Sequence, residues 1–512
     1  MKCLIQGRKL YFIEYTSDEI NWIDQKLTWD SHPISEVAID PNTKEEVKVQ
    51  IVPKEKLLFS SDTHPWTYYG LYEPLRKLAQ FPMELQNPDV ANYVRPEVPK
   101  DLLQGIDLAE FQVAAIQKAI MLKNGLTEIP TGGGKTEVIL GVLKYLLDNS
   151  LIKQALIIVP SKGLAEQIQQ RAILRGFNES QIGVVHGSRK EFDRPIVAAV
   201  VDSINDGIQQ QRKKVMDLVL GADFVGYDET HHLRADSWIR VAETAINTNY
   251  LLGWSGSPFH NLDVLQNSGD ALIYGLMGRL IFTETYEHLL ELGFIARPVV
   301  LMKNVPGRFS NQGGFKSAYD RYIVNNQFRN QAIVDYARFF CEWGFPVLIL
   351  VQRKEHALAL LKMLHDLDPL CVFGGNKSFS VENGGLEESQ IDYNTFRDNF
   401  SKGHYRIVIA SQVMDEGMDI PNIGAVIMGG GGKSRIKISQ RLGRGLRKKK
   451  KGYNLVYIVD FNDFSHVFLS SHSKKRKQFY ADAGAWMFDN HYKYVNVVVT
   501  HAEQLREEES ES

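Results

Sequence analysis

Short apolar runs alternate with helical patterns in two successive parts of the chain. In the first part, from about residue 100 to 280, the apolar runs are Ala155–Val159, Ile196–Val201, Phe224–Tyr227 and Leu251–Trp254. In the second part, after residue 300, they are Val347–Val351, Arg406–Ala410, Ala425–Met428 and Leu455–Val459. Apolar strands that alternate with helices are typical of parallel sheets covered by helices on both faces. The pattern predicts an α/β protein with two parallel-sheet domains in tandem.

The flanking segments have a different character. Residues 1–95 begin with strand-like alternation at Lys9–Ile13 and end with the aromatic run Trp66–Tyr72, which indicates a small α+β N-terminal module. A proline-rich stretch, Asn87–Pro99, is typical of a linker. The predicted domains are therefore 1–95 for the N-terminal module, 96–285 and 286–465 for the two sheet domains, and 466–512 for a short helical C-terminal segment with an acidic tail.

Composition excludes several classes of protein. Hydrophobic residues make up 44% and charged residues 23% of the 512 residues, and no apolar run is long enough to span a membrane. The formal charge of −2 excludes a globally basic coat, so binding to phosphates would need local basic patches. Cys3, Cys341 and Cys371 are too widely spaced for a zinc site and are predicted to be reduced, buried thiols. We expect a protein without a membrane partner, located in the cytoplasm.

A glycine-rich segment lies between an apolar run and a helical pattern. It reads Pro130-Thr131-Gly132-Gly133-Gly134-Lys135-Thr136, and Ile129 stands where the usual consensus has its first glycine. In such a loop, glycines let backbone N–H groups approach phosphates, a lysine reaches the terminal phosphates and a hydroxyl ligates Mg²⁺. The segment predicts an ATP site formed by Thr131, Gly132, Gly133, Gly134, Lys135 and Thr136.

Two carboxylates follow the apolar run Phe224–Tyr227. They belong to the segment Asp228-Glu229-Thr230-His231, so they would emerge at the carboxyl end of a strand, where open α/β sheets bind ligands. Taken alone, four polar residues after a strand are more often a helix cap than a catalytic site. Its position downstream of a phosphate loop favours nucleotide chemistry. Asp228 would then hold Mg²⁺ and Glu229 would orient or deprotonate the attacking water.

These two segments resemble motifs I and II of superfamily 2 helicases of the DExH type. The resemblance implies two tandem RecA-like domains that bind ATP and Mg²⁺. It also implies that Gln112 reads the adenine edge, and that Ser255-Gly256-Ser257-Pro258 couples hydrolysis to nucleic acid, with Gly256 where the family has alanine. The segment Ser411–Pro421 resembles motif V, in which Gly417 and Asp419 would approach the nucleotide.

The segment Gln440–Arg447 resembles motif VI of the same family. The resemblance places Gln440 near the nucleotide and makes Arg444 and Arg447 the candidate arginine fingers. Phosphoryl transfer spreads negative charge over the γ-phosphate oxygens, and an arginine delivered to them accelerates the reaction by about 10³ to 10⁵. A solvated basic helix face is the alternative interpretation of these arginines.

The resemblance also implies a nucleic-acid track that runs across the strand ends of both domains. The matching positions are Ser161, Lys162, Ser203, Gln352, Arg353 and Ser411. Hydroxyls, amides and cations at strand ends are suited to phosphate contacts that do not depend on base sequence. Each of these residues is also typical of a loop or a helix cap. Two basic runs, Lys448–Lys451 and Lys474–Lys477, carry charge that suits either a phosphate backbone or a solvated surface.

Domain order, domain size and the segment Tyr69–Leu75 resemble the UvsW-type recombination helicases of bacteriophages. This resemblance implies a monomeric motor that acts on branched DNA such as Holliday junctions, forks and displacement loops, with recombination or replication proteins as partners. The aromatic run Trp66–Tyr72 would stack on unpaired bases or form the core of the N-terminal module.

Three other functions share some or all of these features. A double-strand DNA translocase of a restriction-type complex has the same ATPase motifs, although the sequence has no convincing nuclease constellation. An RNA helicase also has them, because phosphate contacts are common to both polymers. A non-catalytic clamp would tolerate loss of Lys135, Glu229 or Arg447, and all three are present. The clamp is therefore the least favoured interpretation.

Overall fold

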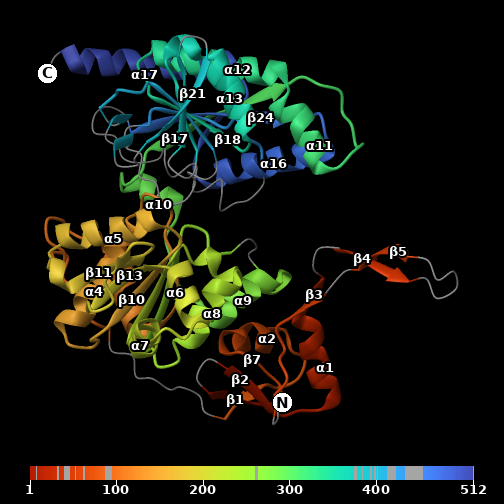
Figure 1. Cartoon of the computed structure of the whole chain (residues 1–512), viewed down its shortest axis with the longest axis vertical. Coiled ribbons are helices and arrows are strands. Elements are labelled where there is room, and N and C mark those ends of the chain that lie inside the picture. Colours follow the sequence, from red (N-terminus) through yellow and green to blue (C-terminus); the bar gives the residue numbers. More distant parts are fainter. Residues whose placement is uncertain are drawn as a thin grey trace. The chain divides into compact units, whose positions relative to one another are not determined.

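A computed structural model describes most of the chain (Figure 1). The described residues are 1–6, 9–30, 34–39, 46–51, 54–61, 64–86, 95–259, 263–373, 377–382, 385–391, 395–396, 399–400, 402–411, 423–432 and 454–510. They form two compact units: one contains residues 1–128 and 136–283, and the other contains residues 129–135 and 284–512. No described helix combines the length and apolar character needed to traverse a lipid bilayer.

The N-terminal part of the first unit is a small α+β module. Its sheet has the strand order β7-β2-β1-β8 and is accompanied by two short two-stranded ribbons, β3–β6 and β4–β5. Its elements are β1 (Lys2–Gln6), β2 (Lys9–Glu14), α1 (Ser17–Lys26), β3 (Thr28–Asp30), β4 (Ile34–Ile39), β5 (Glu46–Ile51), β6 (Lys54–Lys56), β7 (Trp66–Tyr68), η1 (Tyr69–Leu71), α2 (Tyr72–Leu78) and β8 (Glu84–Leu85). Thr16 and Glu19 form a capping box that fixes the start of α1.

The rest of the first unit is an eight-stranded sheet with the order β12-β11-β13-β10-β14-β15-β9-β16. All neighbouring pairs are parallel except β11–β12, as the apolar runs predict. The strands are β9 (Asn124–Glu128), β10 (Ala155–Val159), β11 (Ile182–His186), β12 (Arg189–Lys190), β13 (Ile196–Val200), β14 (Phe224–Asp228), β15 (Tyr250–Ser255) and β16 (Leu280–Thr283). The helices are α3 (Glu110–Leu122), α4 (Lys135–Asp148), α5 (Lys162–Leu174), α6 (Val201–Gln209), α7 (Lys213–Gly221), α8 (Asp236–Thr244) and α9 (Ser268–Met277).

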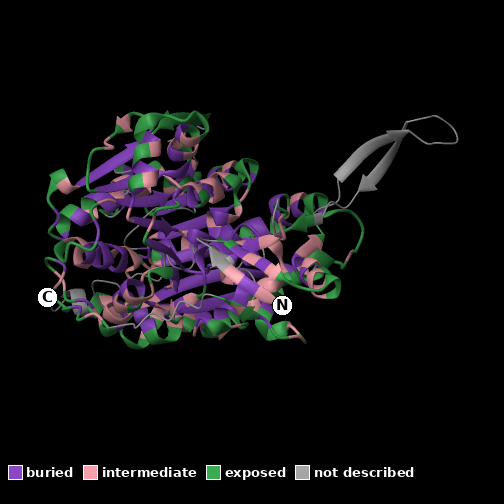
Figure 2. Ribbon diagram, turned by 90° about the horizontal axis from the view of Figure 1, so that it is seen from below, coloured by how far each residue is buried: buried purple, intermediate pink, exposed green. Residues whose placement is uncertain are grey.

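Helices cover both faces of this sheet (Figure 1). Leu156 and Ile158 of β10 pack into a core that includes side chains of α6, α7, α8 and α9, and that core continues into the N-terminal module. The intervening residues of β10 point to the opposite face and are also fully buried. Figure 2 shows the same burial along the central strands. Burial on both faces explains why these strands have no polar alternation in the sequence.

The second unit contains a nine-stranded sheet with the order β21-β20-β19-β22-β18-β23-β24-β17-β25. The strands are β17 (Arg297–Val305), β18 (Val347–Val351), β19 (Leu370–Phe373), β20 (Lys377–Glu382), β21 (Gly385–Gln390), β22 (Ile407–Ser411), β23 (Ala425–Ile427), β24 (Leu455–Asp463) and β25 (Trp486–Phe488). The helices are α10 (Tyr286–Glu291), α11 (Phe315–Tyr319), the π-helix η5 (Asp320–Val324), α12 (Gln327–Glu342), α13 (Lys354–Met363), α16 (Val467–Asp482) and α17 (His491–Ser510).

The C-terminal segment contains a strand that the sequence analysis did not predict. Val299–Leu301 of β17 pair in parallel with Trp486–Phe488, so β25 closes one edge of the second sheet between α16 and α17. Three residues are too few to display the alternation that predicts a strand. Residues 486–488 form a strand because they pair with the edge strand β17.

The three cysteines are free and buried, as predicted. Burial raises the pKa of the Cys3 and Cys341 thiols to about 11 and that of the Cys371 thiol to about 12. All three remain protonated at neutral pH, so none has the reactivity of a thiolate.

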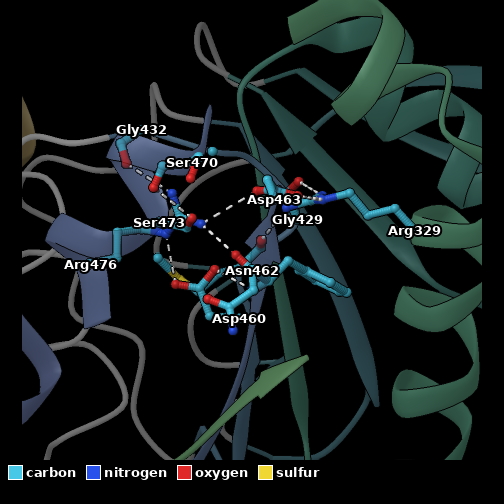
Figure 3. Close-up of polar contacts among 12 residues, drawn as sticks. Arg329, Gly429, Gly432, Asp460, Asn462, Asp463, Ser470, Ser473 and Arg476 are labelled. Carbon is cyan, nitrogen blue, oxygen red and sulfur yellow. Dashed lines mark hydrogen bonds and ion pairs between the residues drawn. The ribbon is translucent and has the colours of Figure 1, made fainter. Parts of the chain in front are cut away.

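A buried network of charges lies at the carboxyl ends of β23 and β24 (Figure 3). Arg329 of α12 and Arg476 of α16 are 0% and 1% exposed. Nε of Arg329 lies 3.1 Å from Asp463, and Nε of Arg476 lies 2.8 Å from Asp460. The hydroxyl of Tyr480 also donates to Asp460 at 2.8 Å. Two cations therefore face two anions, and the network is neutral as a whole.

The same two arginines bind the chain that follows β23. Arg329 donates to the carbonyl oxygens of Met428 and Gly429, and Arg476 donates to that of Gly432 at 3.0 Å. Burial raises the pKa of Asp463, and the guanidinium groups of Arg329 and Arg476 oppose that rise. Burial would lower the pKa of Arg476, but the carboxylates of Asp460 and Asp463 raise it above its ordinary value. The network thus fixes the segment 428–432 to two helices and a strand.

The position of Arg476 corrects part of the sequence analysis. The basic run Lys474–Lys477 was interpreted as a phosphate-binding or solvated patch, but Arg476 faces the sheet and is fully paired. Its helix register explains this, because His472, Ser473 and Tyr480, which lie three or four residues away, are also buried. Lys474, Lys475 and Lys477 remain exposed.

We expect Arg329→Met to destabilise the second unit by about 3–5 kcal/mol, because the substitution leaves Asp463 buried without its guanidinium partner. Urea unfolding of the full chain, together with hydrogen exchange of the β24 and α16 amides, measures this loss. Asp366→Asn is the matched control, since it removes an exposed ion pair from Arg338 and should change stability little. Equal effects of the two substitutions would contradict a structural role for the network.

Candidate functional site

The register of the first sheet brings three sequence motifs to one edge. In β9, β15 and β14, residue Glu128 pairs with Ser255 and Trp254 pairs with Asp228. The phosphate loop follows β9, Ser255-Gly256-Ser257-Pro258 follows β15, and Glu229 follows β14. Because these strands are parallel neighbours, the three segments leave the sheet side by side at its carboxyl edge.

The phosphate loop has the backbone conformation that its glycines allow. Gly132 and Gly134 have φ angles of +95° and +80°, which are left-handed values that other residues rarely adopt. The N–H of Gly133 donates to the carbonyl oxygen of Pro130 at 3.0 Å and forms a tight turn. Helix α4 begins at Lys135, so Lys135 and Thr136 occupy its first turn, and the N-terminus of a helix favours anions.

The acidic pair lies at the end of β14 in a constrained conformation. Asp228 is 5% exposed, and its Oδ1 accepts a hydrogen bond from the N–H of Glu229 at 3.0 Å. Glu229 has φ +57° and ψ +53°, a left-handed conformation that is uncommon for a residue with a side chain. Such strain persists where the surrounding structure enforces it, and it concentrates at functional sites.

The next two residues tie the acidic pair to the segment after β15. The buried hydroxyl of Thr230 lies 3.0 Å from the carbonyl oxygen of Tyr227 and 3.1 Å from that of Trp254. Gly253 leaves room for this threonine, because a Cβ at that position would lie 2.6 Å from the Thr230 hydroxyl. Nδ1 of His231 lies 3.1 Å from Oγ of Ser255 and 3.4 Å from Oε2 of Glu229. The imidazole of His231 therefore lies between Ser255 and Glu229.

Arg234 is a structural partner that the sequence analysis missed. Its guanidinium donates to the carbonyl oxygens of His231 at 3.0 Å and Pro258 at 3.3 Å, and it forms an ion pair with the buried Asp270 of α9. One side chain thus joins the two motifs to α9, which packs on η1 of the N-terminal module. A lone arginine after the acidic motif gives no signal in the sequence, because its partner lies in a distant helix.

Gln112 lies at the start of α3 and is 4% exposed. Its side-chain oxygen accepts a hydrogen bond from the N–H of Ala109 at 3.0 Å, which caps the helix. Reading an adenine edge therefore remains a prediction for this residue.

The predicted nucleic-acid residues of the first unit occupy the same carboxyl edge. Val159 of β10 pairs with Val200 of β13, and Ser161, Lys162 and Ser203 follow these strands. Oγ of Ser161 accepts a hydrogen bond from the N–H of Leu164 at 3.4 Å, so this serine is the N-cap of α5. Lys162 is exposed and Ser203 is partly buried in the first turn of α6. Ser161 therefore has a structural role as a helix cap. Of the three predicted residues, Lys162 is the exposed cation.

In the second unit, the predicted nucleic-acid residues follow β18 and end β22, two neighbouring parallel strands in which Val351 pairs with Ser411. The amide of Gln352 donates to the carbonyl oxygen of Gly431. Arg353 is exposed, and its guanidinium lies 5.9 Å from the ring centre of Tyr319. The remaining predicted residues, Gly417, Asp419, Gln440, Arg444 and Arg447, lie outside the described residues, as does the basic run Lys448–Lys451.

The aromatic run of the N-terminal module is largely core. Tyr68 and Tyr72 are 5% and 9% exposed, and their hydroxyls donate to Glu243 and to the carbonyl oxygen of Met83. Trp66 is partly buried beneath Nζ of Lys9, which lies 4.1 Å from its ring centre. Of the two alternatives for this run, the structure favours packing over stacking on bases.

Comparison with known families gives two matches. Residues 105–260 match the model of the type III restriction enzyme res subunit, and residues 335–449 match the helicase conserved C-terminal domain. The chain belongs to helicase superfamily 2. The first match contains the phosphate loop and the acidic pair, and the second contains the segments that resemble motifs V and VI.

Two curated relatives align with most of this helicase. "Putative helicase 22" of a Sulfolobus islandicus filamentous virus is 23% identical, over 83% of this chain and 75% of its own length. The "DNA 3'-5' translocase XPB2" of Sulfurisphaera tokodaii is 24% identical, over 72% of this chain and 86% of its own length. Two haloarchaeal proteins named "Putative DNA 3'-5' helicase Rad25" also match, and the helicase spans about half of their length.

Two solved structures align with most of this chain. A fragment of a putative HsdR subunit of a type I restriction enzyme from Vibrio vulnificus has a TM-score of 0.54 at 17% identity, over 88% of this chain and 77% of that one. T4 UvsW has a TM-score of 0.43 at 15% identity, over 95% and 98% of the two chains. The predicted fold class, with two tandem RecA-like domains, is confirmed, and the helicase is an ATP-dependent motor of the superfamily 2 type.

We expect Ser255→Ala to reduce the stimulation of ATP hydrolysis by nucleic acid about fivefold, because it removes the hydrogen bond to His231, worth about 1 kcal/mol. Steady-state hydrolysis with and without a nucleic-acid oligomer measures the stimulation. Ser61→Ala is the matched control, since the exposed Ser61 hydroxyl donates locally to the carbonyl oxygen of His64 in the N-terminal module. Identical stimulation in both variants would exclude the His231–Ser255 contact as a coupling element.

Proposed function

We propose that this helicase acts on DNA, and that its substrates are branched structures such as Holliday junctions, forks and displacement loops. The single observation that carries the enzymatic part is the emergence of the phosphate loop, the acidic pair and the Ser255 segment at one sheet edge, with His231 between Ser255 and Glu229. The DNA part is supported by relatives whose names specify DNA. The branched substrate rests on the resemblance of the domain order, the domain size and the segment Tyr69–Leu75 to the UvsW-type helicases.

In the proposed reaction, the N–H groups at the start of α4 and the Lys135 ammonium hold the phosphates of ATP. Glu229 orients the attacking water and accepts its proton, and His231 holds this carboxylate in place. Arg444 and Arg447 remain the predicted source of positive charge for the transferred phosphoryl group.

The donor set is suited to Mg²⁺. Thr136 and Asp228 offer a hydroxyl and a carboxylate, which are the hard oxygen ligands that Mg²⁺ prefers, and Asp228 ends a strand beside β15 at the edge where the loop emerges. When bound, Mg²⁺ would neutralise charge on the phosphates.

Glu229→Gln should lower ATP hydrolysis by about 10²- to 10⁴-fold while the protein still binds ATP, because the amide cannot accept the proton of the attacking water. Hydrolysis and nucleotide binding are measured on the same preparation. Glu179→Gln, an exposed glutamate of the same unit, should hydrolyse ATP normally. Retention of hydrolysis in Glu229→Gln would falsify the assigned role.

A duplex translocase is a second candidate function. The res-subunit model, the fold of the HsdR fragment and the name of the XPB2 relative favour it. The two candidates differ in whether a branch is needed for stimulation and in whether strands separate.

If the branched-DNA proposal holds, a Holliday junction or a fork stimulates ATP hydrolysis more than linear duplex, single strands or RNA, and the branch point moves. The measurement is hydrolysis and strand displacement on each substrate, with Glu229→Gln as the inactive control. Equal stimulation by linear duplex without strand separation indicates the translocase instead. Preferential stimulation by RNA indicates an RNA helicase.

A further inference from the structure

An exposed apolar face lies on the second unit at the carboxyl ends of β17 and β24. We define the aromatic face as Phe309, Phe315, Phe464, Val467 and Phe468, whose exposed fractions range from 40% to 65%. Side chains of this size are ordinarily buried, and several of them exposed together indicate an interaction site.

Backbone hydrogen bonds hold the two contributing segments side by side. The N–H of Ser310 donates to the carbonyl oxygen of Ser465 at 2.9 Å, and the N–H of Val467 donates to that of Ser310 at 3.4 Å. Phe309 and Phe464 each lie next to this junction in the chain. The rings of Phe315 and Phe468 have centres 6.5 Å apart in an edge-to-face arrangement. The face is therefore a composite of α11, the start of α16 and the loop after β17.

The surroundings of the aromatic face are positively charged. Residues 306–325 contain Arg308, Lys316 and Arg321 with Asp320 as their one carboxylate, and residues 464–481 contain no carboxylate at all. In the latter segment Arg476 is paired inside the protein, whereas Lys474, Lys475 and Lys477 are exposed. An open pocket of about 760 Å³ lies on the first segment, lined by Lys316, Ser317, Asp320 and Arg321, among others. Because cations outnumber carboxylates around the aromatic face, we expect its ligand to be a polyanion.

The face also adjoins a predicted phosphate contact. The rings of Phe315 and Tyr319 have centres 5.8 Å apart, and the guanidinium of Arg353 lies 5.9 Å from the ring centre of Tyr319. If a nucleic-acid strand bound one of its phosphates at Arg353, the bases of the neighbouring nucleotides would lie beside the aromatic face.

We infer that the aromatic face binds the unpaired bases of a single strand that passes Arg353. Exposed rings among cations are the combination that proteins use for single-stranded nucleic acid, in which each base stacks on a ring and the phosphates meet positive charge. The inference rests on the proposed nucleic-acid motor function and adds to it a place where bases, rather than phosphates, are held.

The test compares ordinary and abasic oligomers of equal length, as DNA and as RNA, by fluorescence anisotropy with the full chain. The wild-type helicase should bind the ordinary oligomer more tightly than the abasic one. Phe309→Ala combined with Phe464→Ala should weaken binding of the ordinary oligomer about 5- to 30-fold and abolish the preference over the abasic oligomer. Tyr492→Ala, which removes a 78% exposed ring from α17, should change neither.

Phe309→Trp is the rescue variant, since a larger ring at this position should keep or strengthen the preference for ordinary oligomers. Basal ATP hydrolysis without nucleic acid should be unchanged in all variants, which shows that they fold. Unchanged oligomer binding by the double variant overturns the inference and leaves the face as a protein-docking surface. Failure of the wild-type helicase to bind any oligomer overturns the proposed function itself.

Discussion

The hydrogen-bond register of β9, β15 and β14 is the constraint on which the candidate ATPase site depends. These strands are buried on both faces, so their apolar side chains fix which residues face each layer of helices, and the parallel register then fixes where each strand ends. A shift of one residue in β14 would turn its apolar set over and displace Asp228 from the edge. The position of the candidate reactive groups is therefore set by core packing, and Asp228 is itself buried at the end of β14.

In the second unit, buried charged groups rather than apolar side chains fix the position of a segment that follows a strand. The segment 428–432 leaves the sheet after β23 and precedes Gln440–Arg447, the segment that resembles motif VI, in the sequence. Carbonyl oxygens of 428–432 accept hydrogen bonds from Arg329 and Arg476. Gln352, a predicted nucleic-acid residue, donates to Gly431 in the same segment. A buried, neutral network resists displacement because breaking any of its ion pairs leaves a buried charge without its partner, which is strongly destabilising. The segment 428–432 is thus held by buried groups and contacted by a residue of the predicted track.

The sequence predicted what depends on local pattern and missed what depends on distant partners. Continuous apolar runs predicted both parallel sheets, and the phosphate loop and the acidic pair were found because their residue types are adjacent in the chain. Arg234 and Asp270 lie in separate elements, and only the fold brings them together. Arg476 was assigned to a basic surface run because a charge count cannot show which turn of a helix faces the sheet. The strand β25 was missed because its three residues follow the edge of β17.

Aromatic residues illustrate the same limit most clearly. The run Trp66–Tyr72 and the aromatic face are both rich in aromatic residues, yet Tyr68 and Tyr72 are buried while Phe309 and Phe464 are exposed. The difference arises because the N-terminal module packs against α9, where Gly275 allows close approach to Tyr68, whereas the described residues place no element over the aromatic face. Burial gives the first group a structural role, and exposure beside cations leaves the second available to a ligand. In a motor whose predicted phosphate contacts are indifferent to base identity, exposed rings are the groups that distinguish a strand with unpaired bases from one whose bases are stacked within a duplex.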